Sequence, residues 1–114
     1  MITAEQLKDV MERADALKRY LNIDQRKVEL EEEQLRTQDP HFWDDPKAAQ
    51  VQMKKVKGIE KWIKGYENVR TLADELQLAF DYHKEDLVTE EEVDNDYDKA
   101  IKAIEDLELK NMLD

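Results

Sequence analysis

The sequence contains no cysteine and no serine, and it has only two glycines and two prolines among 114 residues. The absence of cysteine excludes disulfides, a thiolate nucleophile and cysteine-ligated metal or redox sites. Two glycines are too few for a glycine-rich phosphate loop, and so few turn residues do not suit an all-β fold. The sequence also has only two histidines, and Asp81, His83 and Asp86 form its one cluster of metal-ligand types, without a recognised ligand spacing. The sequence therefore predicts a protein that is not an enzyme and needs no cofactor or metal.

The start of the chain has no basic segment followed by an apolar run and a small-residue cleavage site, which an export signal requires. No long apolar run typical of a membrane span follows. We therefore expect a cytoplasmic protein that has neither a membrane nor a small-molecule substrate as a partner.

Negative charge is abundant but unevenly distributed. The 29 acidic residues exceed the 18 basic ones and give a net charge of -11. Residues 85–114 hold twelve of the acidic residues and three of the basic ones, whereas residues 39–84 are neutral. Within that neutral segment four lysines follow one another at steps of three, four and three, namely Lys54, Lys57, Lys61 and Lys64. This lysine stripe predicts contact with RNA phosphates or with an acidic partner, and an ordinary solvated face is the alternative.

Apolar residues recur every three or four positions along most of the chain, which is the period of an amphipathic helix. In the first such segment they are Leu7, Val10, Ala14, Leu17 and Leu21. The pattern predicts an all-α fold, an elongated antiparallel helical bundle or hairpin of about four helices, at residues 3–21, 24–37, 46–84 and 90–113. We expect three helices to meet along the second half of the third helix. Near residues 42 and 43 we expect only the second and third helices to face each other. The length suits a single helical domain over residues 1–114.

Local signals mark where the helices begin. Two segments have the spacing of a capping box, Thr3 with Gln6 and Thr89 with Glu92. Asn22 tolerates the left-handed conformation that ends a helix, and we expect Asp24 to cap the second helix while Ile23 packs on Val28.

The segment that joins the second and third expected helices, residues 39–46, is called here the aromatic turn. Its Asp39-Pro40 pair ends the second helix, and its Asp45-Pro46 pair begins the third. Between these pairs lie Phe42 and Trp43. We expect both rings to fill the end of the hairpin, because two helices offer little else to close it.

The aromatic turn and the residues after it also carry a resemblance to a known family. Residues 39–50 read Asp-Pro-His-Phe-Trp-Asp-Asp-Pro-Lys-Ala-Ala-Gln. They resemble the Pro-x-x-Trp-x-acid-Pro-x-x-Ala-Gln signature in the N-terminal domain of the bacterial peptide chain release factor 2 family. The matching residues are Pro40, Trp43, Asp45, Pro46, Ala49 and Gln50. Residues 13–24 and 107–112 resemble flanking segments of that family, so the resemblance covers essentially the whole chain.

This resemblance implies a role in translation termination. In the family the whole factor recognises the stop codons UGA and UAA and triggers hydrolysis of peptidyl-tRNA, through a Ser-Pro-Phe loop and a Gly-Gly-Gln loop. A sequence without serine or adjacent glycines contains neither loop, so the resemblance supplies no catalytic residue. The first domain of the family lies on the ribosome beside the stalk base, with ribosomal protein L11 and its rRNA. The resemblance therefore implies a ribosome-docking module, and we expect its lysine stripe to face rRNA.

Two alternatives come from other classes of protein. The first is a free-standing helical adaptor or coiled-coil protein that binds a partner helix along its own apolar face. The second is an acidic mimic of nucleic acid formed by the last helix, which would bind a basic protein in a salt-sensitive manner. A reading frame that continues beyond Asp114 into a Gly-Gly-Gln region would favour the docking module over the adaptor.

Overall fold

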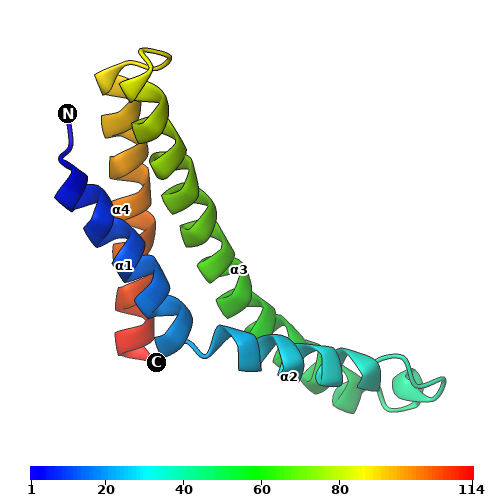
Figure 1. Ribbon diagram of the computed structural model, residues 1–114. Coiled ribbons are helices and arrows are strands. Elements are labelled where there is room, and N and C mark those ends of the chain that lie inside the picture. Colours follow the sequence, from blue (N-terminus) through cyan, green and yellow to red (C-terminus); the bar gives the residue numbers. More distant parts are fainter. The chain divides into compact units, whose positions relative to one another are not determined.

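The computed structural model describes residues 1–114 and contains four α-helices, one short 3-10 helix and no strand. The helices are α1 (Ala4–Tyr20), α2 (Ile23–Arg36), α3 (Pro46–Lys84) and α4 (Glu90–Leu113), and the 3-10 helix η1 (Phe42–Asp44) lies between α2 and α3 (Figure 1). The predicted all-α class is confirmed, and each predicted helix end lies within one residue of the observed end. No helix combines the length and the apolar character that crossing a membrane demands.

The chain divides into two compact units. The first unit consists of Met1–Leu21 and Gly65–Asp114 and contains α1, the second part of α3, and α4. The second unit is Asn22–Lys64 and contains α2, η1 and the first part of α3. Three helices therefore form the first unit and two form the second, as the apolar pattern predicts.

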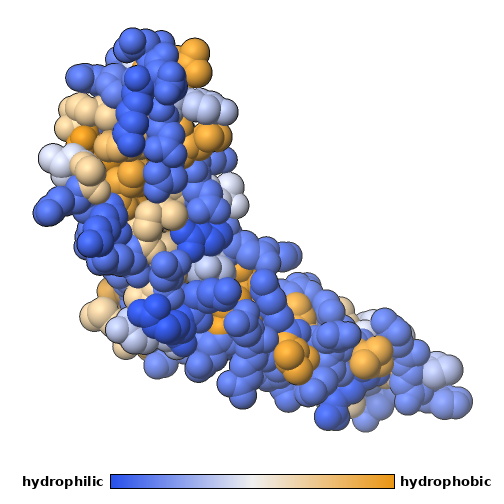
Figure 2. Space-filling model, in the orientation of Figure 1, coloured by the Kyte–Doolittle hydropathy of each residue, from blue (hydrophilic) through white to orange (hydrophobic).

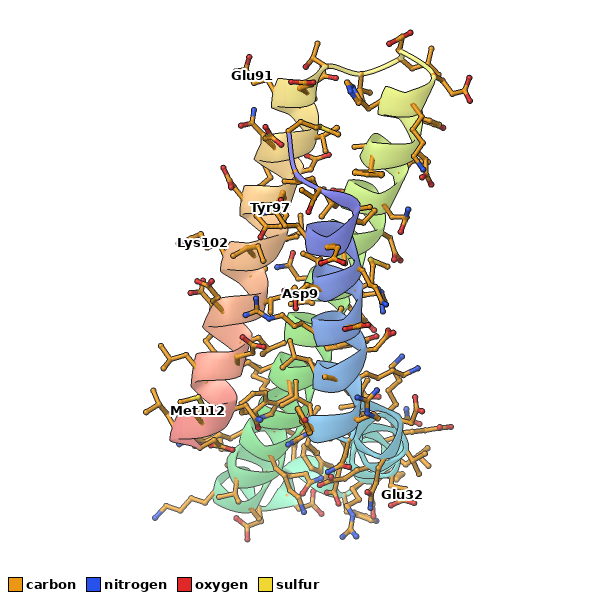
Figure 3. The ribbon with its side chains drawn as sticks, turned by 60° about the vertical axis from the view of Figure 1, so that its left-hand side comes forward. Asp9, Glu32, Glu91, Tyr97, Lys102 and Met112 are labelled. Atoms are coloured by element: carbon orange, nitrogen blue, oxygen red, sulfur yellow. The ribbon has the colours of Figure 1, made fainter.

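The first unit has a continuous apolar core. All five residues of the expected α1 pattern are buried, from Leu7 to Leu21. In this unit α1 and α4 lie side by side, with side chains filling the space between the helices, and Lys102 and Met112 of α4 lie on its outer side (Figure 3). The core residues from the other two helices are Tyr66, Val69, Ala73, Leu76, Ala79, Val93, Ala100, Ile104 and Leu107. Burial on three sides explains why this unit leaves its central side chains almost no contact with water.

Two polar contacts tie α1 and the residues before it to α4. The guanidinium of Arg13 donates to both carboxylate oxygens of Glu108, at 2.6 Å from Nη2 and 3.3 Å from Nε. The carboxylate of Asp94 accepts from the N–H of Ile2 at 2.9 Å and pairs with the amino group of Met1 at 3.0 Å. The hydrogen bond from that amino group is the main reason why the pKa of Asp94 is lowered. These contacts fix the register of α1 along α4.

Both predicted capping boxes are confirmed. The Thr3 hydroxyl accepts from the N–H of Gln6 at 3.1 Å, and the Gln6 side chain accepts from the N–H of Thr3 at 2.8 Å. Thr89 and Glu92 make the same reciprocal pair at 3.1 Å and 3.0 Å. Each pair satisfies donors that the first helical turn leaves without partners.

The predicted left-handed conformation of Asn22 is confirmed, with φ 51° and ψ 49°. The expectation that Asp24 caps α2 is wrong, because the helix already begins at Ile23 and Asn22 is its N-cap residue. Asp24 therefore lies in the first turn, where its negative charge suits the helix dipole. The expected packing of Ile23 on Val28 is also wrong. Ile23 is fully buried, but Val28 is 57% exposed, because the cap lies two residues earlier than expected, at Asn22, and the stapling positions move with it.

The second unit has a thinner core. Its buried apolar residues are Ile23, Ala49, Val56, Ile59 and Ile63, and the carboxylate residue Glu33 is buried with them. Two other apolar residues of α2, Val28 and Leu35, are more than half exposed. Two paired helices can cover only one side of each other, so much of the surface of both remains open to water.

The expectation that Phe42 and Trp43 fill the end of the hairpin is wrong for Trp43, which is 62% exposed. Phe42 is partly buried, and the two rings meet edge to face with centroids 5.2 Å apart. Backbone and side-chain hydrogen bonds already hold the aromatic turn, as described below, so its closure does not require either ring.

Candidate nucleic-acid interface

The lysine stripe lies on the first part of α3, whose start is well defined. Pro46 is the first helical residue, and the carboxylate of Asp45 accepts from the N–H of Ala48 at 3.2 Å. From there the residues that face α2 are buried, namely Ala49, Val56, Ile59 and Ile63. The four lysines of the stripe are all exposed. Because an α-helix turns about 100° per residue, these lysines lie beside and opposite the buried face, over about 15 Å of helix.

The ammonium groups of the stripe are largely free of internal partners. Only Lys64 forms an ion pair, at 3.9 Å from Glu60 on the same helix. Lys54, Lys57 and Lys61 make no ion pair with an acidic side chain. An exposed pair at the separation found for Lys64 contributes little and exchanges readily with solvent. All four ammonium groups are therefore available to an external anion.

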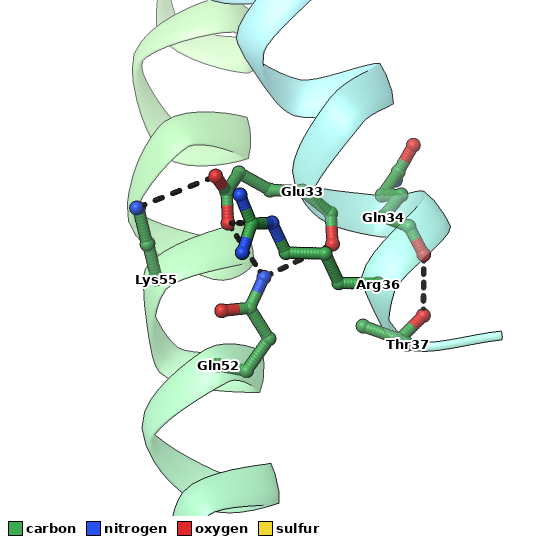
Figure 4. Close-up of polar contacts among 6 residues, drawn as sticks. All are labelled: Glu33, Gln34, Arg36, Thr37, Gln52 and Lys55. Atoms are coloured by element: carbon green, nitrogen blue, oxygen red, sulfur yellow. Dashed lines mark hydrogen bonds and ion pairs between the residues drawn. The ribbon is translucent and has the colours of Figure 1, made fainter. Parts of the chain in front are cut away.

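Lys55 differs from the stripe because it points to a buried carboxylate. Its Nζ atom lies 3.4 Å from Oε1 of Glu33 on α2, and Arg36 Nε lies 3.6 Å from Oε2 (Figure 4). The amide of Gln52 donates to Oε2 at 2.7 Å and to the backbone carbonyl of Glu33 at 3.0 Å. The Gln52 hydrogen bond is the largest cause that lowers the pKa of Glu33. This cluster joins α2 to α3. The ammonium group of Lys55 is therefore paired within the second unit.

The Glu33 cluster is the feature that sequence reasoning missed, because Glu33 stands in a run of three glutamates, Glu31–Glu33. A signal for it exists in the sequence. Counting at helical steps from Ile23 gives Arg26, Leu30 and Glu33, which are all buried or partly buried. When the helical period of α2 is counted from Ile23, Glu33 falls on the face that is covered by α3.

The two units differ in net charge. The second unit has nine basic and nine acidic residues, and within it residues 46–64 of α3 carry six lysines and one glutamate. The first unit has nine basic and twenty acidic residues, so it holds the whole net charge of -11. On the face shown in Figure 2, polar residues dominate, with isolated apolar patches between them. A basic surface suited to phosphates therefore exists on α3 although the chain as a whole is acidic.

The six signature residues do not form one site. Pro40 and Pro46 flank η1, Asp45 caps α3, and Ala49 is buried against α2. Trp43 and Gln50 are exposed. Most of the signature therefore shapes the turn between α2 and α3, whereas the large side chain of Trp43 is mostly exposed and contacts the ring of Phe42.

His83 and Asp86, two members of the Asp81, His83 and Asp86 cluster, stabilise the turn between α3 and α4. Nδ1 of His83 lies 3.0 Å from the carbonyl oxygen of Val88, and Asp86 adopts a left-handed conformation with φ 59°. No group of three or more acidic or histidine side chains is arranged to hold a metal ion.

Comparison with known proteins shows which family the sequence matches. The family model described as the PCRF domain matches residues 23–114, which include α2, the lysine stripe and α4. The chain belongs to the PCRF domain family. Peptide chain release factor 2 of Bordetella pertussis is 32% identical to this PCRF domain over 108 residues, which cover 93% of the chain and 29% of that protein. Peptide chain release factor 2 of Streptomyces avermitilis is 24% identical over 112 residues, which cover 96% of the chain and 30% of that protein.

The resemblance inferred from the aromatic turn is thus confirmed for this PCRF domain. The chain spans about 30% of the length of the curated relatives that it matches, as with peptide chain release factor 2 of Bordetella avium, 32% identical over 111 residues, 96% of the chain and 30% of that protein. No solved structure matches the chain.

Proposed function

We propose that this PCRF domain is the ribosome-docking part of a cytoplasmic translation termination factor, which in full length directs termination at UGA and UAA. In this proposal the domain acts by binding alone and takes no part in the hydrolytic step of protein biosynthesis. Its partners are the rRNA and ribosomal protein L11 at the stalk base. The exposed lysine stripe is the observation that carries the proposal, and the similarity to release factors named above supports it.

The physical basis of the proposed contact is electrostatic. Lysine ammonium groups bind phosphates as point charges and release the counterions that phosphates hold in solution. Four such contacts correspond to a slope of about -3 in a plot of log affinity against log salt concentration. The stripe lies on the part of α3 within the second unit and is already exposed, so docking requires no rearrangement of that unit.

Reversal of the stripe charges tests this proposal. In the variant, Lys54, Lys57, Lys61 and Lys64 are all replaced by Glu. Cosedimentation of the 114-residue chain with bacterial ribosomes is measured at a series of potassium chloride concentrations. We expect the variant to bind at least ten-fold more weakly at low salt, and its salt dependence to become shallower. The circular dichroism spectrum of the variant should remain helical, because the replaced side chains are exposed.

A matched control separates position from total charge. Lys8, Lys99, Lys102 and Lys110 are exposed lysines of the first unit, and replacing them by Glu changes the net charge by the same amount. This control should retain most of the affinity. If both variants bind equally weakly, total charge and not the stripe governs binding. If the stripe variant binds like the unmodified chain, the stripe is an ordinary solvated face.

A further inference from the structure

The aromatic turn presents a tryptophan that the fold does not use. Trp43 is 62% exposed, and its contact with another aromatic ring is an edge-to-face pair with Phe42 at 5.2 Å and 85°. A tryptophan side chain carries one of the largest apolar surfaces of any residue, and water is a poor environment for it. Tryptophan is also among the residues that contribute most to binding when a partner buries them.

The backbone around Trp43 is held in place without help from its ring. The N–H of His41 donates to the carboxylate of Asp39 at 2.8 Å, and the N–H of Phe42 donates to the carbonyl of Asp39 at 2.9 Å. The N–H of Asp44 donates to the carbonyl of His41 at 3.0 Å, and these two side chains also meet at 3.0 Å. Trp43 is therefore displayed from a preorganised turn, which lowers the entropic cost of burying it against a partner.

The charge around Trp43 indicates what kind of partner fits. Asp39, Asp44 and Asp45 are all exposed within the aromatic turn, and none of them pairs with a lysine or an arginine. Asp44 contacts His41, and Asp39 and Asp45 accept backbone N–H groups. No lysine or arginine neutralises these three carboxylates, so they repel the phosphates of a nucleic acid. They complement a surface that carries lysine or arginine. The aromatic turn is thus the electrostatic opposite of the lysine stripe on the same unit.

We propose that the aromatic turn is a second docking surface, in which Trp43 enters an apolar pocket on a basic protein surface while the nearby carboxylates face the basic residues around that pocket. This inference rests on the proposed function in one respect, because the basic protein is taken to be a component of the ribosome. It assigns protein contact to the aromatic turn and RNA contact to the lysine stripe.

Photocrosslinking tests this assignment directly. Trp43 is replaced by p-benzoylphenylalanine in the 114-residue chain, the chain is irradiated with bacterial ribosomes, and the products are digested with ribonuclease or protease. We expect a crosslinked product at this position that survives ribonuclease and is destroyed by protease. The same replacement at Lys57 should give a product with RNA. An RNA product at position 43, or no product there while the chain still sediments with ribosomes, would overturn the inference.

An affinity measurement on ordinary variants supplies a second test. Trp43→Ala should weaken cosedimentation with ribosomes by about ten-fold or more, as expected for a buried interface tryptophan. Asp44→Asn should weaken it by a few-fold, mainly at low salt, because the change removes one of the negative charges that face the basic surface. Inside the turn this change affects only the contact with His41. Tyr20→Ala is the matched control, since Tyr20 is an aromatic residue of the first unit that is 69% exposed.

The outcomes distinguish the two proposals. If Trp43→Ala and Tyr20→Ala both bind like the unmodified chain, the second docking surface is refuted and the proposed function stands on the lysine stripe. If the unmodified chain does not sediment with ribosomes at any salt concentration, the proposed function fails and the ribosomal partner of Trp43 fails with it.

Discussion

The two units of the chain solve the same packing problem with different numbers of helices. In the first unit three helices enclose the apolar residues, and Val10, Leu76 and Ile104 have no contact with water. In the second unit two helices share one buried face, and a hydrogen-bonded carboxylate, Glu33, occupies part of it. A unit of two helices therefore buries fewer apolar residues than a unit of three helices and leaves more of its helix surface exposed. Both proposed docking surfaces lie on that thinner unit.

The largest expected effect comes from placing a charge in the three-helix core. Leu76→Asp puts a carboxylate without a partner at a position with 0% exposure, and we expect a loss of several kcal/mol of folding free energy. Since small domains are stable by about 5–15 kcal/mol, much of the first unit should unfold. Hydrogen exchange should then rise throughout α1 and α4, and circular dichroism should show loss of helix.

Two further variants sharpen this result. Leu78→Asp lies two residues further on the same helix but at 50% exposure, and its effect should stay within about 0.5 kcal/mol. Ile59→Asp places the same charge in the core of the second unit, where it should raise exchange in α2 and leave α1 and α4 protected. Equal loss of protection in both units after either core change would show that they unfold as one body.

A smaller effect, confined to acidic pH, distinguishes the buried carboxylate of the second unit. The pKa of Glu33 in the folded chain lies below its ordinary value of 4.5, chiefly because of the hydrogen bond from Gln52. The unfolded chain therefore binds the proton more readily, and the contribution of Glu33 to stability is complete above about pH 4.5. It is lost as the pH falls through the lower pKa of the folded state. Glu33→Gln should reduce the difference between urea midpoints measured at pH 7 and pH 3.

The neighbouring variant Glu32→Gln is the control for this measurement, because Glu32 is exposed on the same helix (Figure 3). It should keep the pH dependence of the unmodified chain. Asp94 of the first unit also has a lowered pKa, so some loss of stability in acid should persist in Glu33→Gln. Identical pH dependence in the two glutamine variants would show that the Glu33 cluster adds nothing to stability.

The same comparison explains what the sequence could predict. Helix spans and capping boxes depend on residues only a few positions apart, so periodicity and the Thr3 and Thr89 spacings were sufficient. The exposure of the lysine stripe followed from the same period. The burial of Glu33 was not predicted, because its main partner, Gln52, lies 19 residues away on another helix. The exposure of Trp43 was not predicted, because Trp43 lies in a turn, where helical periodicity does not indicate which side chains are buried.

The smallest expected effect compares the two glycines of α3, one in each unit. Around Gly58, in the second unit, an added Cβ atom meets nothing within 4 Å. Gly58→Ala should therefore stabilise the chain by about 0.5–1 kcal/mol, because glycine is the more flexible residue in the unfolded state and the weaker helix former. At Gly65, in the first unit, the new Cβ atom would lie 3.2 Å from Cδ1 of Leu107 on α4.

The side chain of Leu107 is itself buried, so it has little room to move away from an alanine at position 65. Gly65→Ala should consequently gain nothing or lose stability, although its helix propensity changes by the same amount as at Gly58. Urea denaturation of both variants measures the difference between an open helix surface and a packed one. If both alanines stabilised the chain equally, the packing of α3 against Leu107 of α4 would be looser than the 3.2 Å distance implies.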